Sequence, residues 1–148
     1  MIHRALAAAG IVLLATAATA TSAHAGVPPA KSSFTVMTSF LSSPSDIVAA
    51  TGPWADCTDV TDLSNYVNQV SPSKLQFSGE KQVGCASGDV VIHYDATTNA
   101  RSGAGLTFGT WSVVSSDNPS IIGGSGTVSG DPRGCPDCIL DVFTGRVY

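Results

Sequence analysis

The sequence offers few side chains that could carry out catalysis, and they do not form a recognisable set. His93 is the one histidine beyond residue 25. A serine–histidine–aspartate triad would therefore need His93, with Asp95 or Asp141 orienting its ring. No Gly-x-Ser-x-Gly turn marks one of the many serines as the nucleophile. We interpret His93 as a strand residue that faces solvent or a barrel interior, and we predict no catalytic residue.

Three aspartates on predicted strands could instead supply the two carboxyl groups that glycoside cleavage requires. These are Asp89, Asp95 and Asp141. Structural roles compete with that interpretation, because Asp89 begins a strand after a turn and Asp141 can pair with Arg101 or Arg146. We favour the structural roles, and whether the protein is an enzyme stays open, with a binding protein preferred.

The four cysteines are expected to form disulfides. Cys57, Cys85, Cys135 and Cys138 all follow the N-terminal apolar segment, and disulfides are usual in exported chains. Three connectivities are possible, and we favour Cys57–Cys85 with Cys135–Cys138 because each pair is nearest in sequence. The Cys-Pro-Asp-Cys spacing also occurs in thiol-redox motifs, but here a turn precedes it and a strand-like run follows. With only His93 as a further ligand, we expect no metal site.

Four aromatic residues and His93 are candidates for a ligand site. A barrel of about eight strands has an interior that side chains fill or that holds one small ligand. Ordinary core packing is the competing interpretation for each of them. We interpret Trp54 as packed under a loop, rather than exposed for contact with a sugar or a partner. The candidate ligand-binding residues are Trp111, Tyr94, Phe77, Phe108 and His93.

Composition excludes some function classes. The chain carries a formal net charge of −4, and only 12% of its residues are charged. It therefore lacks the basic surface that nucleic acids or anionic lipids require. The glycines of segment 123–126 do not form a phosphate loop, since no Gly-Lys-Ser/Thr and no helix follow. We expect no cofactor and no nucleic-acid partner; a small apolar ligand and a second copy of the chain remain possible partners.

The N-terminus is predicted to direct export. A weakly basic start, the apolar run Ala5–Ala20 and the small-x-small site Ala23–Ala25 are typical of a signal peptide over residues 1–25. A membrane anchor is the alternative, but the run is short for a bilayer span and threonines interrupt it. We predict a secreted mature chain, residues 26–148, that forms one domain without a membrane span and begins with a loose leader.

The elements that would position these residues are predicted to be short strands. The segment Gly105–Gly130 contains two β-type runs around a turn, and its apolar positions change parity at Gly109, which indicates a bulge. A bulge or bend is likewise expected at Gly79. Alternating residues and turn-formers predict the remaining strands at Phe34–Leu41, Ile47–Thr51, Lys74–Val83, Asp89–Thr97 and Ile139–Tyr148.

Residues 54–73 are compatible with two structures. Leu63, Tyr66, Val67 and Val70 have helical spacing. The same segment could be a strand over Thr58–Leu63 followed by an irregular loop. We favour the strand and loop, because asparagines weaken the helix. The whole pattern then predicts an all-β fold, an antiparallel β-barrel of about eight strands, with a β-sandwich as the alternative.

Five motifs follow one another in the second half of the chain: Phe77-Ser78-Gly79-x-Lys81, Gly88-Asp89, Gly109–Val114, Gly124-x-Gly126-x-x-x-Gly130 and Asp141-x-x-Thr144-Gly145-Arg146. This ordered set resembles small secreted bacterial proteins of the allene oxide cyclase and dirigent β-barrel superfamily. The resemblance covers Phe77–Tyr148, and it implies an eight-stranded antiparallel barrel with a central cavity, often oligomeric. One departure is Asp117–Ile121, which stands where the family has Gly-Thr-Gly and an aromatic residue. No catalytic residue of the enzymatic relatives can be carried over.

Three functions follow as hypotheses. The first is a secreted, non-catalytic barrel that binds a small apolar ligand or a protein partner. The second is an isomerase or cyclase that folds a reactive substrate in the cavity, as the resemblance implies. The third is a structural or cell-surface interaction protein that works through exposed edges or an oligomer interface.

Overall fold

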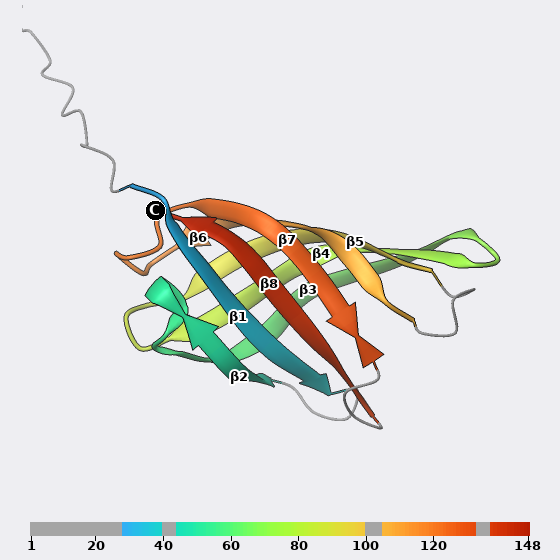
Figure 1. Cartoon of the computed structure of the whole chain (residues 1–148), viewed down its shortest axis with the longest axis horizontal. Helices are drawn as coiled ribbons and strands as arrows, with labels where there is room; N and C mark the ends of the chain where they lie inside the picture. Colours follow the sequence, from blue (N-terminus) through green and yellow to red (C-terminus); the bar gives the residue numbers. More distant parts are fainter. Residues whose placement is uncertain (1–27, 40–43, 100–104, 133–136) are drawn as a thin grey trace, which may run out of the picture.

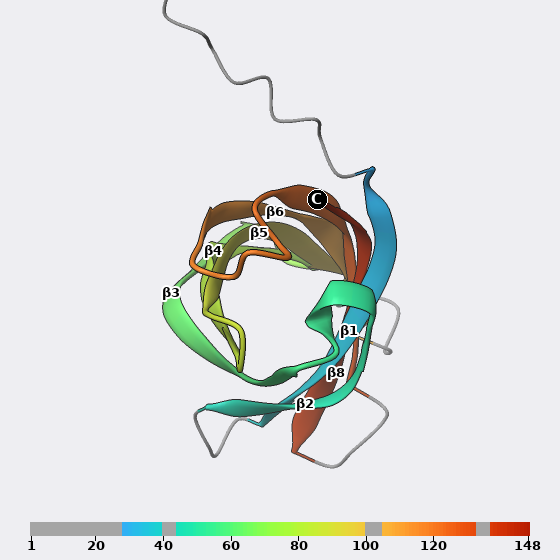
Figure 2. The same cartoon turned by 90° about the vertical axis from the view of Figure 1, so that its left-hand side faces the viewer.

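The computed structural model describes residues 28–39, 44–99, 105–132 and 137–148, which form a closed antiparallel barrel of eight strands. Each strand pairs with its sequence neighbours, and β1 pairs with β8 to close the barrel (Figures 1 and 2). This confirms the barrel rather than the sandwich. The predicted signal peptide lies outside the described residues. The strands are β1 (Ala30–Ser39), β2 (Ser45–Thr51), β3 (Cys57–Ser71), β4 (Lys74–Cys85), β5 (Val90–Asn99), β6 (Thr107–Ser116), β7 (Gly124–Asp131) and β8 (Cys138–Val147).

An aromatic cluster fills one end of the barrel. The Phe34 and Phe143 rings stack with centroids 4.7 Å apart, and Phe34 also contacts Trp54. Trp54 is fully buried in the short 3-10 turn η1 (Gly52–Trp54), which folds inward at this end (Figure 2). Its indole Nε1 donates a hydrogen bond to Ser32 Oγ at 3.1 Å. Trp54 therefore packs in the core, as the sequence favoured, and Trp111 meets it edge-on with ring centroids 6.0 Å apart.

The prediction for residues 54–73 was wrong in its second half. β3 is neither a helix nor a short strand with a loop, but continues as one strand from Cys57 to Ser71. Its partner β4 runs beside it through the pair Ser71↔Lys74, so backbone hydrogen bonds support the strand. Residues 62–70 are exposed apart from the partly buried Ser64, so the alternation of buried and exposed residues that marks a strand is missing here.

The two predicted bulges lie elsewhere. Gly109 pairs regularly with Ala96, and its neighbour Phe108 faces outward, 61% exposed. The apolar positions therefore change parity at Gly109 because Phe108 is an exposed apolar residue. The irregularity in the pairing of β5 with β6 lies at Val114 instead. Similarly, β4 pairs with β5 without interruption at Gly79, and the irregularity nearest to Gly79 is the extra residue Leu63 in β3.

Glycines allow neighbouring backbones to approach closely. A Cβ atom on Gly109 would lie 2.0 Å from the Asp95 carbonyl oxygen, and one on Gly126 would lie 2.0 Å from the Thr144 carbonyl oxygen. No side chain fits at such distances, so these positions require glycine. In the glycine-rich β7 the neighbouring backbone therefore comes closer than a side chain would allow.

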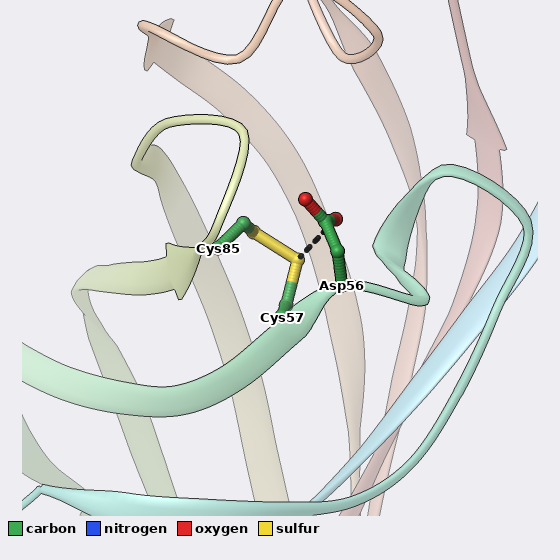
Figure 3. A group of neighbouring side chains, drawn as sticks. All are labelled: Asp56, Cys57 and Cys85. Carbon is green, nitrogen blue, oxygen red and sulfur yellow. Dashed lines mark hydrogen bonds between the residues drawn. A yellow bond between two sulfur atoms is a disulfide. The ribbon is translucent and has the colours of Figure 1, made fainter.

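One predicted disulfide is confirmed. Cys57 at the start of β3 faces Cys85 at the end of β4, and their sulfur atoms are bonded (Figure 3). The bridge lies at the same end of the barrel as the aromatic cluster. The other predicted bridge, Cys135–Cys138, involves Cys135, which lies outside the described residues.

Candidate functional site

A cavity of about 140 Å³ lies in the barrel, with Phe143 of the aromatic cluster in its wall and the exposed residues Asp62 and Asn65 at its open side. One part of its wall is aromatic or aliphatic, and the other carries one lysine and two aspartates. Such a division is typical of sites that hold an amphipathic small molecule. The lining residues are Thr38, Asp62, Asn65, Phe77, Lys81, Tyr94, Ala96, Thr107, Val128, Ile139, Asp141 and Phe143.

Lys81 places a buried ammonium group in this wall. It is 7% exposed and lies in the inward-facing row of β4. Register places it opposite Asp62 of β3, and its Nζ lies 2.5 Å from Asp62 Oδ1. The same Nζ lies 5.1 Å from the centre of the Tyr94 ring. A buried ammonium is costly unless it is paired, and here Asp62 and the face of the Tyr94 ring pair with it.

Asp141 contributes a second carboxyl group from β8. Thr38 Oγ1 donates a hydrogen bond to its Oδ2 at 3.1 Å. Burial raises the pKa of Asp141 above its ordinary value, while the positive charge of Lys81 and the Thr38 hydrogen bond act in the opposite direction. Gly130 makes room for this carboxyl group, because a Cβ there would lie 2.5 Å from Asp141 Oδ1. The cavity therefore contains a carboxyl group that takes up a proton more readily than usual.

Tyr94 supplies a phenol that stays neutral at physiological pH. Burial raises the pKa of Tyr94 to about 12, and the negative charges of Asp62 and Asp141 add to the increase. A neutral phenol can donate and accept one hydrogen bond each. Together with Lys81 it gives the cavity two donors beside two carboxyl groups.

The structure brings together two of the predicted ligand-binding residues. Tyr94 and Phe77 both line the cavity. Trp111 lies in the aromatic cluster, 3% exposed, with its indole nitrogen donating to the Thr144 carbonyl. Phe108 and His93 lie on the outer surface and do not line the cavity with Tyr94 and Phe77.

His93 forms an exposed pair rather than part of an interior site. Its Nε2 lies 3.1 Å from Asp95 Oδ2 on the outer face of β5. Hydrogen bonds from Ser78 and then from His93 lower the pKa of Asp95. Asp141 points into the cavity and therefore does not join His93. Arg146 alternates to the opposite face of β8 from Asp141, and Arg101 lies outside the described residues.

The sequence reasoning missed Lys81 and Asp62. A signal for Lys81 was present, because Leu75, Phe77, Lys81 and Val83 share one parity along β4. A lysine in an otherwise inward-facing row indicates a buried, paired charge. No comparable signal marks Asp62, since its role depends on how β3 aligns with β4.

One further cluster of ligand-type atoms lies at the disulfide, but it cannot bind a metal through sulfur. Asp56, Cys57 and Cys85 come within 4.8 Å of one another (Figure 3). Both cysteines are oxidised, so neither offers a thiolate. The 3.8 Å contact between Cys57 Sγ and Asp56 Oδ1 is not a hydrogen bond, because a disulfide sulfur carries no proton. Asp56 instead accepts hydrogen bonds from the backbone and side chain of Ser87, which lower its pKa.

Comparison with known proteins identifies no relative: no family model, no curated protein and no solved structure matches the chain. The eight-stranded antiparallel barrel that the sequence resemblance implied is present, and the comparisons identify no family. Among the described residues, no helix has the length and apolar character needed to cross a bilayer.

Proposed function

We propose that the protein is an exported, non-catalytic barrel that binds one small ligand in the interior cavity. The observation that carries this proposal is the cavity's division into an apolar wall, with Phe77, Val128 and Phe143, and a charged wall, with Lys81 and Asp141. A site divided in this way suits a molecule with an apolar body and one hydrogen-bonding end.

Size and charge narrow the ligand class. A cavity of about 140 Å³ is close to the roughly 150 Å³ apolar cavity that admits benzene. It is smaller than the usual range of about 300–1,000 Å³ for drug-sized ligands. Two carboxyl groups face one ammonium, so a phenol, alcohol or amine suits the charged wall better than a carboxylate does.

Binding of two matched probes tests this proposal. p-Cresol and p-toluate share a ring and methyl group and differ in the polar end. Isothermal titration or amide chemical shifts should give a dissociation constant for p-cresol that is at least about tenfold lower than that for p-toluate. Equal affinities, or no binding of p-cresol at millimolar concentration, would contradict the proposal.

A cavity-filling variant locates the binding. Ala96→Leu adds volume to the cavity wall, whereas Val114→Leu adds volume on the exposed side of β6. We expect the first variant to weaken p-cresol binding at least about tenfold and the second to leave it unchanged. If both variants bind as the parent does, the ligand does not enter this cavity.

An isomerase or cyclase is the second candidate function. The neutral Tyr94 phenol, the Lys81 ammonium and the easily protonated Asp141 carboxyl group lie around one cavity, and such groups can act as general acids or bases. The resemblance to the allene oxide cyclase and dirigent barrels supports it. The small cavity favours the binding role. Turnover of a reactive substrate that is lost in both Asp141→Asn and Ala96→Leu would instead favour the enzyme.

Export of the mature chain rests on the N-terminal sequence. The small-x-small site Ala23–Ala25 supports cleavage after Ala25. Mass spectrometry of the protein recovered from the culture medium should give a mature N-terminus at Gly26. Protein retained in the cell with residues 1–25 attached would contradict export.

A further inference from the structure

The second half of β3 has a long unpaired edge. β2 pairs with β3 only through Ser45↔Val60 and Asp46↔Asp59, whereas β4 accompanies β3 as far as Ser71. From Thr61 to Ser71, one edge of β3 thus has no partner strand in the described part of the chain. Figure 1 shows the β3–β4 hairpin extending beyond the rest of the barrel, so the edge is accessible. Its backbone donors and acceptors are arranged to bind another strand.

Between its two bulges, at Leu63 and Val70, this edge lacks the charged residues and proline that normally prevent strand pairing. Exposed edges are usually interrupted by charged residues or proline. Segment 63–71 contains neither. It also carries four of the large hydrophobic side chains that are more than one-third exposed: Leu63, Tyr66, Val67 and Val70.

We propose that this edge pairs antiparallel with the same edge of a second copy, giving a dimer with two-fold symmetry. A symmetric pairing brings identical segments together, so a charged edge would place like charges near one another. The uncharged segment 63–71 avoids this, although the chain as a whole is negatively charged. The two-fold arrangement uses the edge of both copies, so assembly stops at two chains.

The alternation of side chains restricts the register. If the two-fold axis of the dimer is perpendicular to the sheet, each residue lies opposite a residue of the second copy that faces the same side of the sheet. Because facing alternates along a strand, the residue numbers of such a pair add to an even sum. Between the extra residues Leu63 and Val70 the strand alternates regularly, and a register centred on Val67 pairs Asn65–Gln69 with the same residues of the second copy. It places Tyr66 opposite Asn68 of the second copy. An interface of this length lies at the small end of specific interfaces, and the dimer is accordingly expected to be weak.

The oligomeric state of edge variants tests the proposal. Sedimentation velocity from about 1 µM to 1 mM should show a reversible monomer–dimer equilibrium. Tyr66→Lys places a charge on the edge and should raise the dissociation constant at least about tenfold. Phe108→Lys is the matched control, because Phe108 is similarly exposed (61% against 72% for Tyr66) but β6 is flanked there by β5 and β7. It should leave the equilibrium unchanged.

A compensating substitution tests the register. Adding Asn68→Asp to Tyr66→Lys places opposite charges across the interface in the Val67-centred register and should restore dimerisation. Circular dichroism and an intact disulfide establish that each variant is folded. A monomer throughout the concentration range, or equal effects of Tyr66→Lys and Phe108→Lys, would overturn the proposal. Failure of the compensating substitution would overturn this register.

Discussion

Lys81 Nζ lies 2.5 Å from Asp62 Oδ1, across the pairing of β4 and β3. The two partners differ in exposure, because the Lys81 side chain is 9% exposed and that of Asp62 is 42% exposed. Loss of Lys81 leaves a carboxylate that water can solvate. Loss of Asp62 leaves an ammonium that water can scarcely reach. The pair is therefore asymmetric in what each partner contributes to stability.

Asp62→Asn should consequently destabilise the fold more than Lys81→Met does. We expect Asp62→Asn to lower the free energy of unfolding by about 1–2 kcal/mol, less than for a fully buried pair because Asp62 is partly solvated. Lys81→Met should cost less than about 1 kcal/mol, since it removes a buried charge and keeps the aliphatic chain. Urea denaturation at pH 7 measures both.

The double variant and an exposed control complete this test. Asp62→Asn with Lys81→Met should be more stable than Asp62→Asn alone, because the unpaired ammonium is gone. Asp89→Asn changes an exposed aspartate that contacts Gln82, and it should shift stability by no more than about 0.5 kcal/mol. Equal losses in the two single variants would show that the pair does not depend on burial.

The Asp141 carboxyl group should make the native state less stable as pH rises. Its pKa is higher in the folded than in the unfolded chain, so the native state binds more protons between the two values. Stability contributed by protonation is present below the unfolded value of 3.8 and is lost as pH rises through the folded pKa. Thr38 can donate to an asparagine at this position as it does to the aspartate.

Asp141→Asn should therefore stabilise the protein at pH 7. The gain over the parent protein should shrink as pH falls and disappear below the unfolded pKa. Thermal unfolding of both proteins from pH 3 to pH 7 measures this difference. Asp56 and Asp95, whose pKa values are lowered, are present in both proteins, so their effects on the pH dependence of stability cancel in the difference. The difference therefore reports on the Asp141 carboxyl group. A gain that does not change with pH would contradict the raised pKa.

Tyr94 should ionise only in strongly alkaline solution. Burial raises its pKa to about 12, and the negative charges of Asp62 and Asp141 add to the increase. The rise in absorbance at 295 nm should therefore include a component with a midpoint near pH 12, and Tyr94→Phe should remove that component. Circular dichroism over the same range separates ionisation from alkaline unfolding. If the absorbance difference between the parent protein and Tyr94→Phe has its midpoint near the ordinary tyrosine value of about 10 while the protein is folded, the prediction is wrong.

The barrel could be predicted from the sequence because inward-facing and outward-facing residues alternate along each short strand. Val90, Ile92, Tyr94 and Ala96 face inward in β5 as their spacing indicated, since a strand needs only a period of two to define its inner face. The Cys57–Cys85 bridge was predictable for a related reason: it joins the ends of two strands that are consecutive in the chain. Local signals were sufficient for both.

The charged wall was not predictable because it depends on register. Lys81 lies opposite Asp62 because β3 has two extra residues, Leu63 and Val70, between this pair and the hairpin turn. No local pattern encodes those extra residues. The length of β3 was missed because both faces of its second half are exposed, and an exposed strand has no apolar period. The prediction of a bulge at Gly109 was wrong because Phe108 is apolar yet faces solvent.

The Cys57–Cys85 disulfide should account for a large share of the stability. It closes a loop between residues 28 positions apart, for which the chain-entropy model gives about 3.5 kcal/mol. The double variant Cys57→Ser/Cys85→Ser should lose about that amount, measured by urea denaturation under non-reducing conditions. Cys57 is buried and its hydroxyl replacement has no designed partner, so Cys57→Ala/Cys85→Ala separates the loss of the bridge from the burial of a polar group. A loss below about 1 kcal/mol in the alanine variant would show that β3–β4 pairing alone already orders the segment that the bridge constrains.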